Sequence, residues 1–186
     1  FEKLSRLDPA ARAVSAYNSA RMFIYKREYD KAMEYIERGE KAEPNHPMLK
    51  IFRSAVYYYR GDAELAIGLM KTVLEEHPEM DGIRPLYAVY LAGSGKLDEA
   101  REQLTDDVLS VSRADHDSAY WVTSTYALLD EKELALKWLG RAIKLGNERG
   151  FRLSNNLLAE AQKGQREAVE LGKKLADDGD PLRRTS

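Results

Sequence analysis

The sequence predicts an all-α protein: a solenoid of antiparallel helix pairs with about four repeats, a preceding half repeat and a C-terminal helical cap. The first observation is a period shared by four small residues, which recur after 34, 34 and 35 residues at Ala32, Ala66, Ala100 and Ala135. The second is that Pro44 and Pro78 are also 34 residues apart. The third is that each period has room for two amphipathic helices joined by a few residues, which makes the two helices antiparallel neighbours.

The composition of the 186 residues excludes several classes of function. The 29 Lys and Arg residues against 31 Asp and Glu residues give a net charge of −2, so there is no excess of positive charge for binding nucleic acid. The absence of cysteine excludes disulfides, thiolate catalysis and Cys-ligated zinc. No apolar run approaches the roughly 18 residues of a membrane span. We therefore expect neither a nucleic-acid partner nor a membrane-spanning segment.

The first nine residues have the spacing of the second helix of an earlier repeat. The intervals of three and five residues between Phe1, Leu4 and Pro9 also occur between Ile36, Gly39 and Pro44. We interpret residues 1–9 as a second-helix remnant, and we expect further repeats or another domain upstream in the parent protein. A truncated array exposes the surface meant for its neighbour, so self-association through this end is an open alternative.

Residues 10–45 are predicted to form the first full repeat, with helices over 10–26 and 29–43. Small and aromatic side chains in the first of these helices recur at helical spacing. Pro44 ends the second helix, because proline lacks an amide donor and restricts the residue before it. We expect Asn45 to cap the helix that follows.

Three further repeats are predicted at 46–79, 80–114 and 115–146. Each contains one helix pair: 47–60 with 62–76, 81–94 with 96–110, and 115–130 with 132–145. Asp115 or Asp117 is the expected cap at the start of the last pair. The period fades after Gly146. Because an array end must present a polar outer face, we interpret 147–178 as capping helices and 179–186 as a flexible tail.

These residues resemble the tetratricopeptide repeat over 10–146. The resemblance depends on Ala20 and Ala88 in first helices, on the periodic alanines and prolines, and on large first-helix residues at Phe23, Tyr57, Leu91 and Tyr126. Ser112 and Asn147 stand where the third and fourth repeats would have proline. The resemblance implies a right-handed superhelix whose first helices line a concave groove. It also implies a non-enzymatic scaffold that binds a peptide or helix of another protein.

A second function is left open by the end of the array. The last repeat and the residues after it are similar to the ends of tetratricopeptide regions in bacterial multidomain regulators, where such arrays follow kinase, cyclase or transcription-regulator domains. The chain would then be a regulatory or sensory segment of a larger bacterial signalling protein. Such a domain upstream would favour this alternative, whereas further repeats or an export signal would favour a stand-alone scaffold.

The outward side of the predicted first helices supplies the candidate binding residues. They form an aromatic and aliphatic strip with one cation: Tyr17, Asn18, Arg21, Tyr25, Ile51, Phe52, Tyr58, Tyr59, Leu86, Val89, Tyr120 and Trp121. Tyr, Trp and Arg are typical interface anchors, and Arg21 can donate a charge-assisted hydrogen bond to a carboxylate or carbonyl. Such a strip suits an amphipathic helix or an apolar extended segment better than the acidic chaperone tails that some arrays clamp with Lys and Asn.

Two other interpretations of this strip stay open. Many of the rings could belong to the core between repeats, because periodicity alone does not separate two buried faces of a helix. The C-terminal helices could also fold into the groove and fill it.

The sequence contains no enzymatic or metal-binding pattern. No GxSxG, P-loop or GxGxxG motif is present, and acidic pairs such as Glu75–Glu76 lie on amphipathic helices, where a solvated face is the simpler interpretation. His46 and His77 occupy equivalent loops that should lie roughly 10 Å apart, whereas a metal needs ligands that converge. We expect no cofactor, no metal and no enzymatic activity; a pocket with a shifted carboxylate would revive the catalytic hypothesis.

Overall fold

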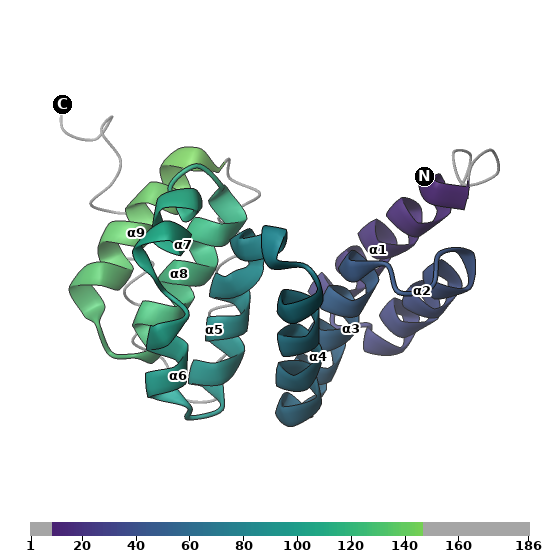
Figure 1. Cartoon of the computed structure of the whole chain (residues 1–186), viewed down its shortest axis with the longest axis horizontal. Coiled ribbons are helices and arrows are strands. Elements are labelled where there is room, and N and C mark those ends of the chain that lie inside the picture. Colours follow the sequence, from purple (N-terminus) through teal and green to yellow (C-terminus); the bar gives the residue numbers. More distant parts are fainter. Residues whose placement is uncertain (1–8, 147–186) are drawn as a thin grey trace. The chain divides into compact units, whose positions relative to one another are not determined.

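The structure is a computed structural model that describes residues 9–146. Between these residues the chain forms helices and turns and contains no strand. The elements are α1 (Pro9–Tyr25), α2 (Tyr29–Ala42), α3 (Pro47–Arg60), α4 (Ala63–Glu76), η2 (Pro78–Ile83), α5 (Arg84–Gly93), α6 (Leu97–Glu102), α7 (Asp106–Ser112), α8 (His116–Leu128) and α9 (Lys132–Leu145) (Figure 1). Of the remnant predicted at 1–9, only Pro9 is described, and it begins α1. The capping helices predicted at 147–178 and the tail at 179–186 lie outside the described residues.

The same turn ends the first helix of each of the four pairs. Its central residue has a left-handed backbone, with φ of 61°, 100°, 81° and 58° at Arg27, Gly61, Gly95 and Asp130. The next amide donates a 2.9 Å hydrogen bond to the carbonyl five residues earlier, at Phe23, Tyr57, Leu91 and Tyr126. This is the Schellman motif, which satisfies the last carbonyls of a helix. The turns are 34, 34 and 35 residues apart, so the period expected from the alanines is also a period of backbone conformation.

The four periodic alanines are inaccessible to solvent. Ala32, Ala66, Ala100 and Ala135 each have 0% exposure. They lie at the start of the second helices, and each amide donates to the carbonyl four residues earlier. A matching buried position on the first helices holds other small residues, at Ala20, Ser54, Ala88 and Thr123. Small side chains at both positions let the paired helices approach closely.

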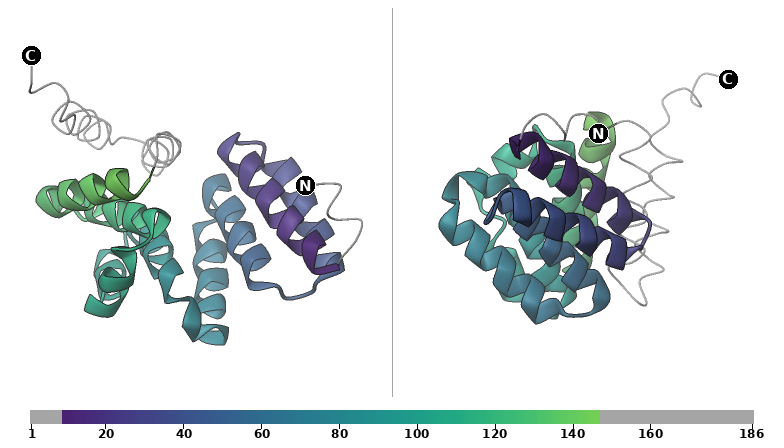
Figure 2. Two further views of the ribbon diagram at one scale, coloured as in Figure 1. Left: turned by 90° about the horizontal axis from the view of Figure 1, so that it is seen from above. Right: turned by 90° about the vertical axis from the view of Figure 1, so that its right-hand side faces the viewer.

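The described residues fall into two compact units, residues 9–79 and residues 80–146. In the first unit, α1 lies beside α2, α3 beside α4, and α3 also contacts both helices of the first pair (Figures 1 and 2). Its core combines small and branched residues, at Ala13, Ala16, Ala20, Ile24, Ala32, Ile36, Leu49 and Val56. Gly39 is needed for this contact, because a Cβ there would lie 2.8 Å from both Ala16 Cβ and Leu49 Cδ2.

Ion pairs join α3 to both of its neighbours in the first unit. Arg53 makes a two-pronged contact with Glu40 of α2, with Nε–Oε1 and Nη2–Oε2 distances of 3.0 and 2.5 Å. Burial lowers the pKa of Arg53, but hydrogen bonds to Glu40 and Tyr57 outweigh it and raise the pKa overall. Lys50 Nζ lies 2.6 Å from Glu76 Oε2 of α4, and this hydrogen bond lowers the pKa of Glu76.

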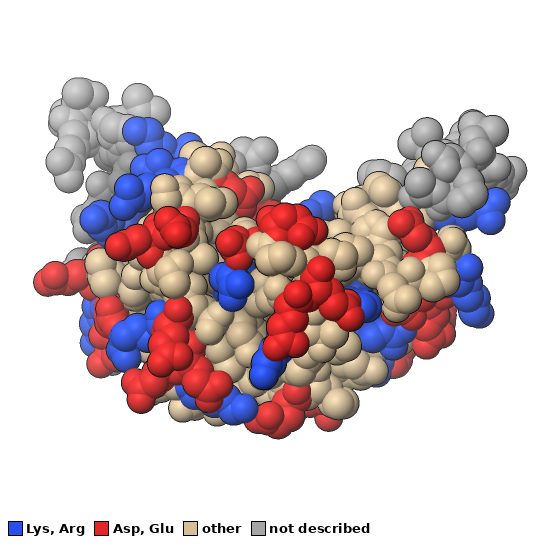
Figure 3. All heavy atoms as spheres, in the orientation of Figure 1, with Lys and Arg blue, Asp and Glu red and all other residues tan. Residues whose placement is uncertain are grey.

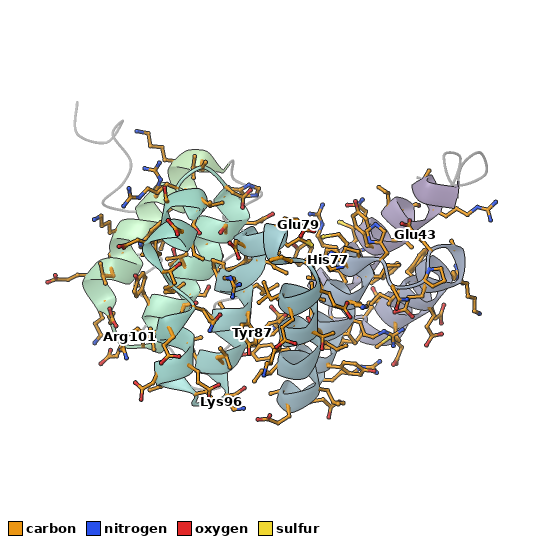
Figure 4. All side chains as sticks on the ribbon, viewed as in Figure 1. Glu43, His77, Glu79, Tyr87, Lys96 and Arg101 are labelled. Carbon is orange, nitrogen blue, oxygen red and sulfur yellow. The ribbon has the colours of Figure 1, made fainter. Side chains whose placement is uncertain are left out.

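The second unit is built around α5 and α8. The helix α8 contacts α5, α7 and α9, and α6 contacts α5. Thr125 of α8 is fully buried, and its hydroxyl donates to the Pro85 carbonyl of α5 at 3.4 Å. Arg101 of α6 holds Glu131 at the start of the last second helix, with Nη2–Oε1 and Nε–Oε1 distances of 2.9 and 3.1 Å; Figure 4 labels Arg101 on α6.

Two predicted helix ranges are wrong in the third pair. The first helix begins at Arg84 rather than 81, because Pro85 fits only the first turn and the preceding stretch forms the 3-10 segment η2. The second helix does not run unbroken from 96 to 110. It is divided into α6 and α7, because Thr105 has extended backbone and its hydroxyl accepts from the Val108 amide at 3.3 Å, which starts a new helix.

The prediction that Asn45 caps α3 is also wrong, and of the two caps expected for α8 the structure shows one. Asn45 has a left-handed backbone (φ 66°), and the capping residue is His46, whose Nδ1 accepts from the Met48 amide at 3.2 Å. At the start of α8 the cap is Asp115, whose carboxylate accepts from the Ser118 amide at 2.7 Å. Both capping side chains satisfy amides that have no partner within the helix.

Candidate partner-binding surface

A cluster of aromatic rings lies between α1 and α3 in the first unit. The Tyr17 ring stacks on Phe52, with centroids 5.9 Å apart and an interplanar angle of 15°. Tyr17 also meets the His46 ring, with centroids 5.6 Å apart and the planes tilted by 41°. Tyr17 and Phe52 are both half-buried and pack against the core of the unit. Each ring therefore has one side fixed by packing and another open to solvent, which is the usual state of an interface anchor.

A second group of rings lies at the other end of α3. Tyr59 stacks on Tyr29 with centroids 6.3 Å apart, and Tyr58 meets Tyr59 edge to face at 5.5 Å. Burial raises the pKa of Tyr58. All three rings are half-buried. The predicted strip on α3 is therefore a set of rings that support each other and remain partly accessible.

Arg21 lies on α1 between Tyr17 and Tyr25, four residues from each. Residues four apart on a helix are neighbours on one face. The Arg21 side chain is half-buried, and its Nε is inaccessible to solvent without a hydrogen-bond partner. Asn18, one turn before Arg21, uses its amide nitrogen to donate to the Val14 carbonyl at 2.8 Å, which leaves its side-chain oxygen as an acceptor. A ligand oxygen cannot reach the inaccessible Arg21 Nε, so it would bind the terminal nitrogens of the half-buried guanidinium.

The predicted residues divide into a buried set and a half-exposed set. Four are buried, with 3%, 9%, 6% and 6% of their surface exposed at Ile51, Leu86, Val89 and Tyr120. The half-exposed set is Tyr17, Asn18, Arg21, Tyr25, Phe52, Tyr58, Tyr59 and Trp121. The rings of α1 and α3 are brought together in the first unit, whereas Trp121 belongs to α8 in the second. The accessible part of the strip is thus concentrated on α1 and α3.

In the first three helix pairs, the acids lie on the second helices and are absent from the first helices. The first helices α1, α3 and α5 contain six cations and no acid: Arg12, Arg21, Lys50, Arg53, Arg60 and Arg84. The second helices α2, α4 and α6 contain ten acids, at Asp30, Glu34, Glu37, Glu40, Glu64, Glu75, Glu76, Asp98, Glu99 and Glu102. On the face shown in Figure 3, acidic and basic side chains are interspersed, so the sorting follows helices rather than a single charged field.

Sequence reasoning missed a charged hollow at the turns of the first unit. It has a volume of about 330 Å³ and is lined by Arg27, Glu28, Tyr29, Asp30, Lys31 and Arg60. Lys31 pairs with Glu28, and Arg60 pairs with Asp30. The repeated left-handed turn was the available signal, since Arg27 and Gly61 are equivalent positions one period apart. Because its charges are paired in this way, the hollow has only a weak preference for a ligand of either sign.

The three histidines serve local roles. His46 caps α3, His77 Nδ1 lies 3.3 Å from Glu79 Oε1 just after α4 (Figure 4), and His116 Nε2 lies 3.2 Å from Asp117 Oδ1. Within residues 9–146, no group of three or more His, Asp or Glu side chains has the arrangement of a metal site. In the same part of the chain, no helix has the length and apolar character needed to span a membrane.

Comparison with known proteins identifies the fold without a family. No family model matches the chain, and no curated protein matches its sequence. Two solved structures of MamA are similar. "MamA RS-1 ArsTM double mutant" is 16% identical, with a TM-score of 0.51 over 91% of this chain and 97% of that one. "MamA 41-end from Desulfovibrio magneticus RS-1" is 15% identical, with a TM-score of 0.51 over 94% and 97% of the two chains. At these identities the likeness shows the fold alone, which is an all-α, tetratricopeptide-like solenoid.

Proposed function

We propose that this protein is a non-enzymatic interaction scaffold that binds a peptide or amphipathic helix of another protein on the surface of its first helices. The observation that carries the proposal is the half-exposed ring cluster of α1 and α3. Tyr17, Phe52 and Tyr59 are held in place by ring stacking and by the core, and they remain accessible. Rigid rings of this kind bind with little loss of conformational entropy.

Binding by this surface combines apolar burial with one polar anchor. Apolar side chains of the ligand would cover Tyr17, Phe52 and Tyr59, at roughly 25 cal/mol for each Å² of apolar surface removed from water. Trp121 offers a further half-exposed ring on α8 of the second unit. Ile51, Leu86, Val89 and Tyr120 are buried, so they offer a ligand little surface.

The test is a pull-down from lysate of the source organism with the wild-type chain and two paired variants. Phe52→Ala/Trp121→Ala removes rings from first helices. Leu65→Ala/Leu134→Ala is the matched control, because it removes exposed leucines from the second helices α4 and α9. All proteins are first compared by circular dichroism, so that a change in binding is not confused with unfolding.

We expect a partner that the first-helix variant loses and the second-helix control retains. Retention by the first-helix variant and loss by the control would place binding on the second helices and overturn the proposal. Unfolding of the first-helix variant would show that its rings are core, and would contradict the assignment of Phe52 and Trp121 as binding residues.

A further inference from the structure

We propose that the partner segment is acidic, with one carboxylate held by Arg21 and apolar side chains beside it on the Tyr17–Phe52 ring pair. This inference rests on the proposed function and specifies the chemistry of the ligand. It depends on three features of the first unit: the half-exposed guanidinium of Arg21, the pairing of the α3 cations, and the absence of acids from α1 and α3.

The first feature is the state of Arg21. Its Nε is buried and has no hydrogen-bond partner, although its side chain is half-exposed. A guanidinium remains protonated in proteins and presents its N–H groups as a planar fork. A carboxylate fits this fork with two parallel hydrogen bonds, which are stronger than those of a neutral carbonyl. The terminal nitrogens of the half-exposed guanidinium, rather than the inaccessible Nε, would therefore bind a ligand carboxylate, which would neutralise the positive charge.

The second feature is that the cations of α3 already have acidic partners. Lys50 pairs with Glu76, Arg53 with Glu40, and Arg60 with Asp30. These acids all come from the second helices α2 and α4. Arg38 pairs with Glu34, whereas Arg21 makes no ion pair or hydrogen bond with an acid among residues 9–79. The positive charge that a ligand can neutralise on this surface is therefore located at Arg21.

The third feature is the charge of the surroundings. Neither α1 nor α3 contains an Asp or Glu, so an acidic ligand meets no like charge on the helices that present the rings. A basic ligand would instead meet the like charge of Arg21, and the acids nearest to α3 are already paired with its cations. Electrostatic complementarity of this kind mainly governs which partners are accepted.

The arrangement along α1 adds a spacing requirement. Tyr17 and Arg21 are four residues apart and share one face of the helix, and Phe52 extends the apolar area by stacking on Tyr17. We expect ligands in which an Asp or Glu lies one helical turn, or two positions of an extended strand, from an aromatic or aliphatic residue.

The test is selection from a phage-displayed library of random short peptides, with the full chain as bait. Wild-type protein should enrich peptides that contain Asp or Glu beside an apolar residue. Arg21→Gln should still enrich apolar peptides but lose the acidic preference. Arg12→Gln is the matched control, because it removes the same charge from an exposed position on the same helix and should keep the preference.

The selected peptide then provides a quantitative readout by fluorescence polarisation. We expect Arg21→Gln to weaken binding of the acidic peptide by about tenfold or more, as for a charge-assisted hydrogen bond, and to change binding of the Glu→Gln peptide by less than about twofold. Arg21→Lys retains the charge but not the fork and should give a smaller loss. It therefore serves as the test variant if Arg21→Gln does not fold.

The outcomes separate the two proposals. Selection of no peptide above background by the wild-type protein would overturn the proposed function. Selection of apolar peptides without acidic enrichment would leave the binding function standing and overturn the role of Arg21. If the preference for acidic peptides is unchanged in Arg21→Gln or Arg21→Lys, the role of Arg21 is likewise overturned and the binding function is retained.

Discussion

At the scale of single residues, the repeat is defined by one backbone conformation as much as by its side chains. Two of the four left-handed turn positions hold glycine, at Gly61 and Gly95, whereas the other two hold Arg27 and Asp130. Glycine adopts this conformation freely, but a residue with a Cβ is strained there by about 1–2 kcal/mol. The alanine period could be read from the sequence. The turn period could be read only in part, because Gly61, Gly95 and Asp130 are residue types that adopt a left-handed backbone, whereas Arg27 is not.

Exchanging residue types at these turns should change stability in opposite directions. Gly61→Ala should lower the free energy of unfolding by about 1 kcal/mol, because the φ of 100° is unfavourable for alanine. No atom lies within 4 Å of the added Cβ, so the effect comes from the backbone alone. Arg27→Gly should raise the free energy of unfolding by about 0.5 kcal/mol. Urea denaturation measures both, and a stabilising Gly61→Ala would show that this turn is not left-handed in solution.

Gly39 gives a prediction about packing rather than backbone conformation. Gly39→Ala should destabilise the first unit by about 1–3 kcal/mol, because its Cβ would lie 2.8 Å from Ala16 Cβ and from Leu49 Cδ2. Gly68→Ala on α4 is the control, since nothing lies within 4 Å of its added Cβ. That control should stabilise its helix by about 0.5–1 kcal/mol. Thermal unfolding that finds the two variants equal would contradict the close approach of α1, α2 and α3.

At the scale of helices, local residues decide where each element begins. The helix pairs follow the predicted order, but three boundaries depend on competition that periodicity does not describe. Pro85 delays the start of α5, Thr105 divides the third second helix, and His46 takes the capping position expected for Asn45. At each boundary, neighbouring residues could start or cap the helix, and small differences in backbone geometry decide which one does.

The ion pair between Lys50 of α3 and Glu76 of α4 should make the free energy of unfolding depend on pH. The hydrogen bond from Lys50 lowers the pKa of Glu76 below its ordinary value of 4.5. A depressed carboxyl pKa stabilises the folded state above the unfolded pKa, and this contribution is lost as the pH falls through the folded-state pKa. Glu76→Gln should therefore be less stable than wild type near neutral pH, and the difference should vanish in acid.

Glu75→Gln provides the matched control for that measurement. Glu75 is the neighbouring residue on α4, and its oxygen lies 3.9 Å from Lys71 Nζ in a largely exposed pair. Such pairs contribute little to stability, so this variant should show almost no pH-dependent difference from wild type. Denaturation curves at several pH values compare the two variants. A Glu76→Gln difference that persists unchanged in acid would be evidence against the ion pair.

At the scale of the whole molecule, the fold could be predicted from the sequence, but the exposure of the strip residues could be predicted only in part. The period of 34 residues and the helix pairing followed from spacing, and the structure has the same turns at the same interval. The division between buried and accessible strip residues did not follow, because Ile51 and Phe52 are adjacent in sequence and both apolar. Ile51 is 3% exposed, whereas Phe52 is half-buried and stacked on Tyr17. Only the packing of α3 against its neighbours separates them.

The net charge does not show that the acids of the first three helix pairs lie on the second helices. A total of −2 suggests no preference for charged partners. The separation of acids onto α2, α4 and α6 nevertheless leaves α1, α3 and α5 free of acids. The second helices thus supply the acids that pair with the cations of α3, whereas Arg21 pairs with none of them.

The most direct test of the binding surface is photocrosslinking from one position on each kind of helix. Benzoylphenylalanine is introduced in place of Phe52 on α3 or in place of Leu65 on α4, which is 57% exposed. After irradiation in lysate, we predict a covalent adduct with a partner protein from position 52 and none from position 65. An adduct from position 65 with none from position 52 would contradict the assignment of binding to the first helices.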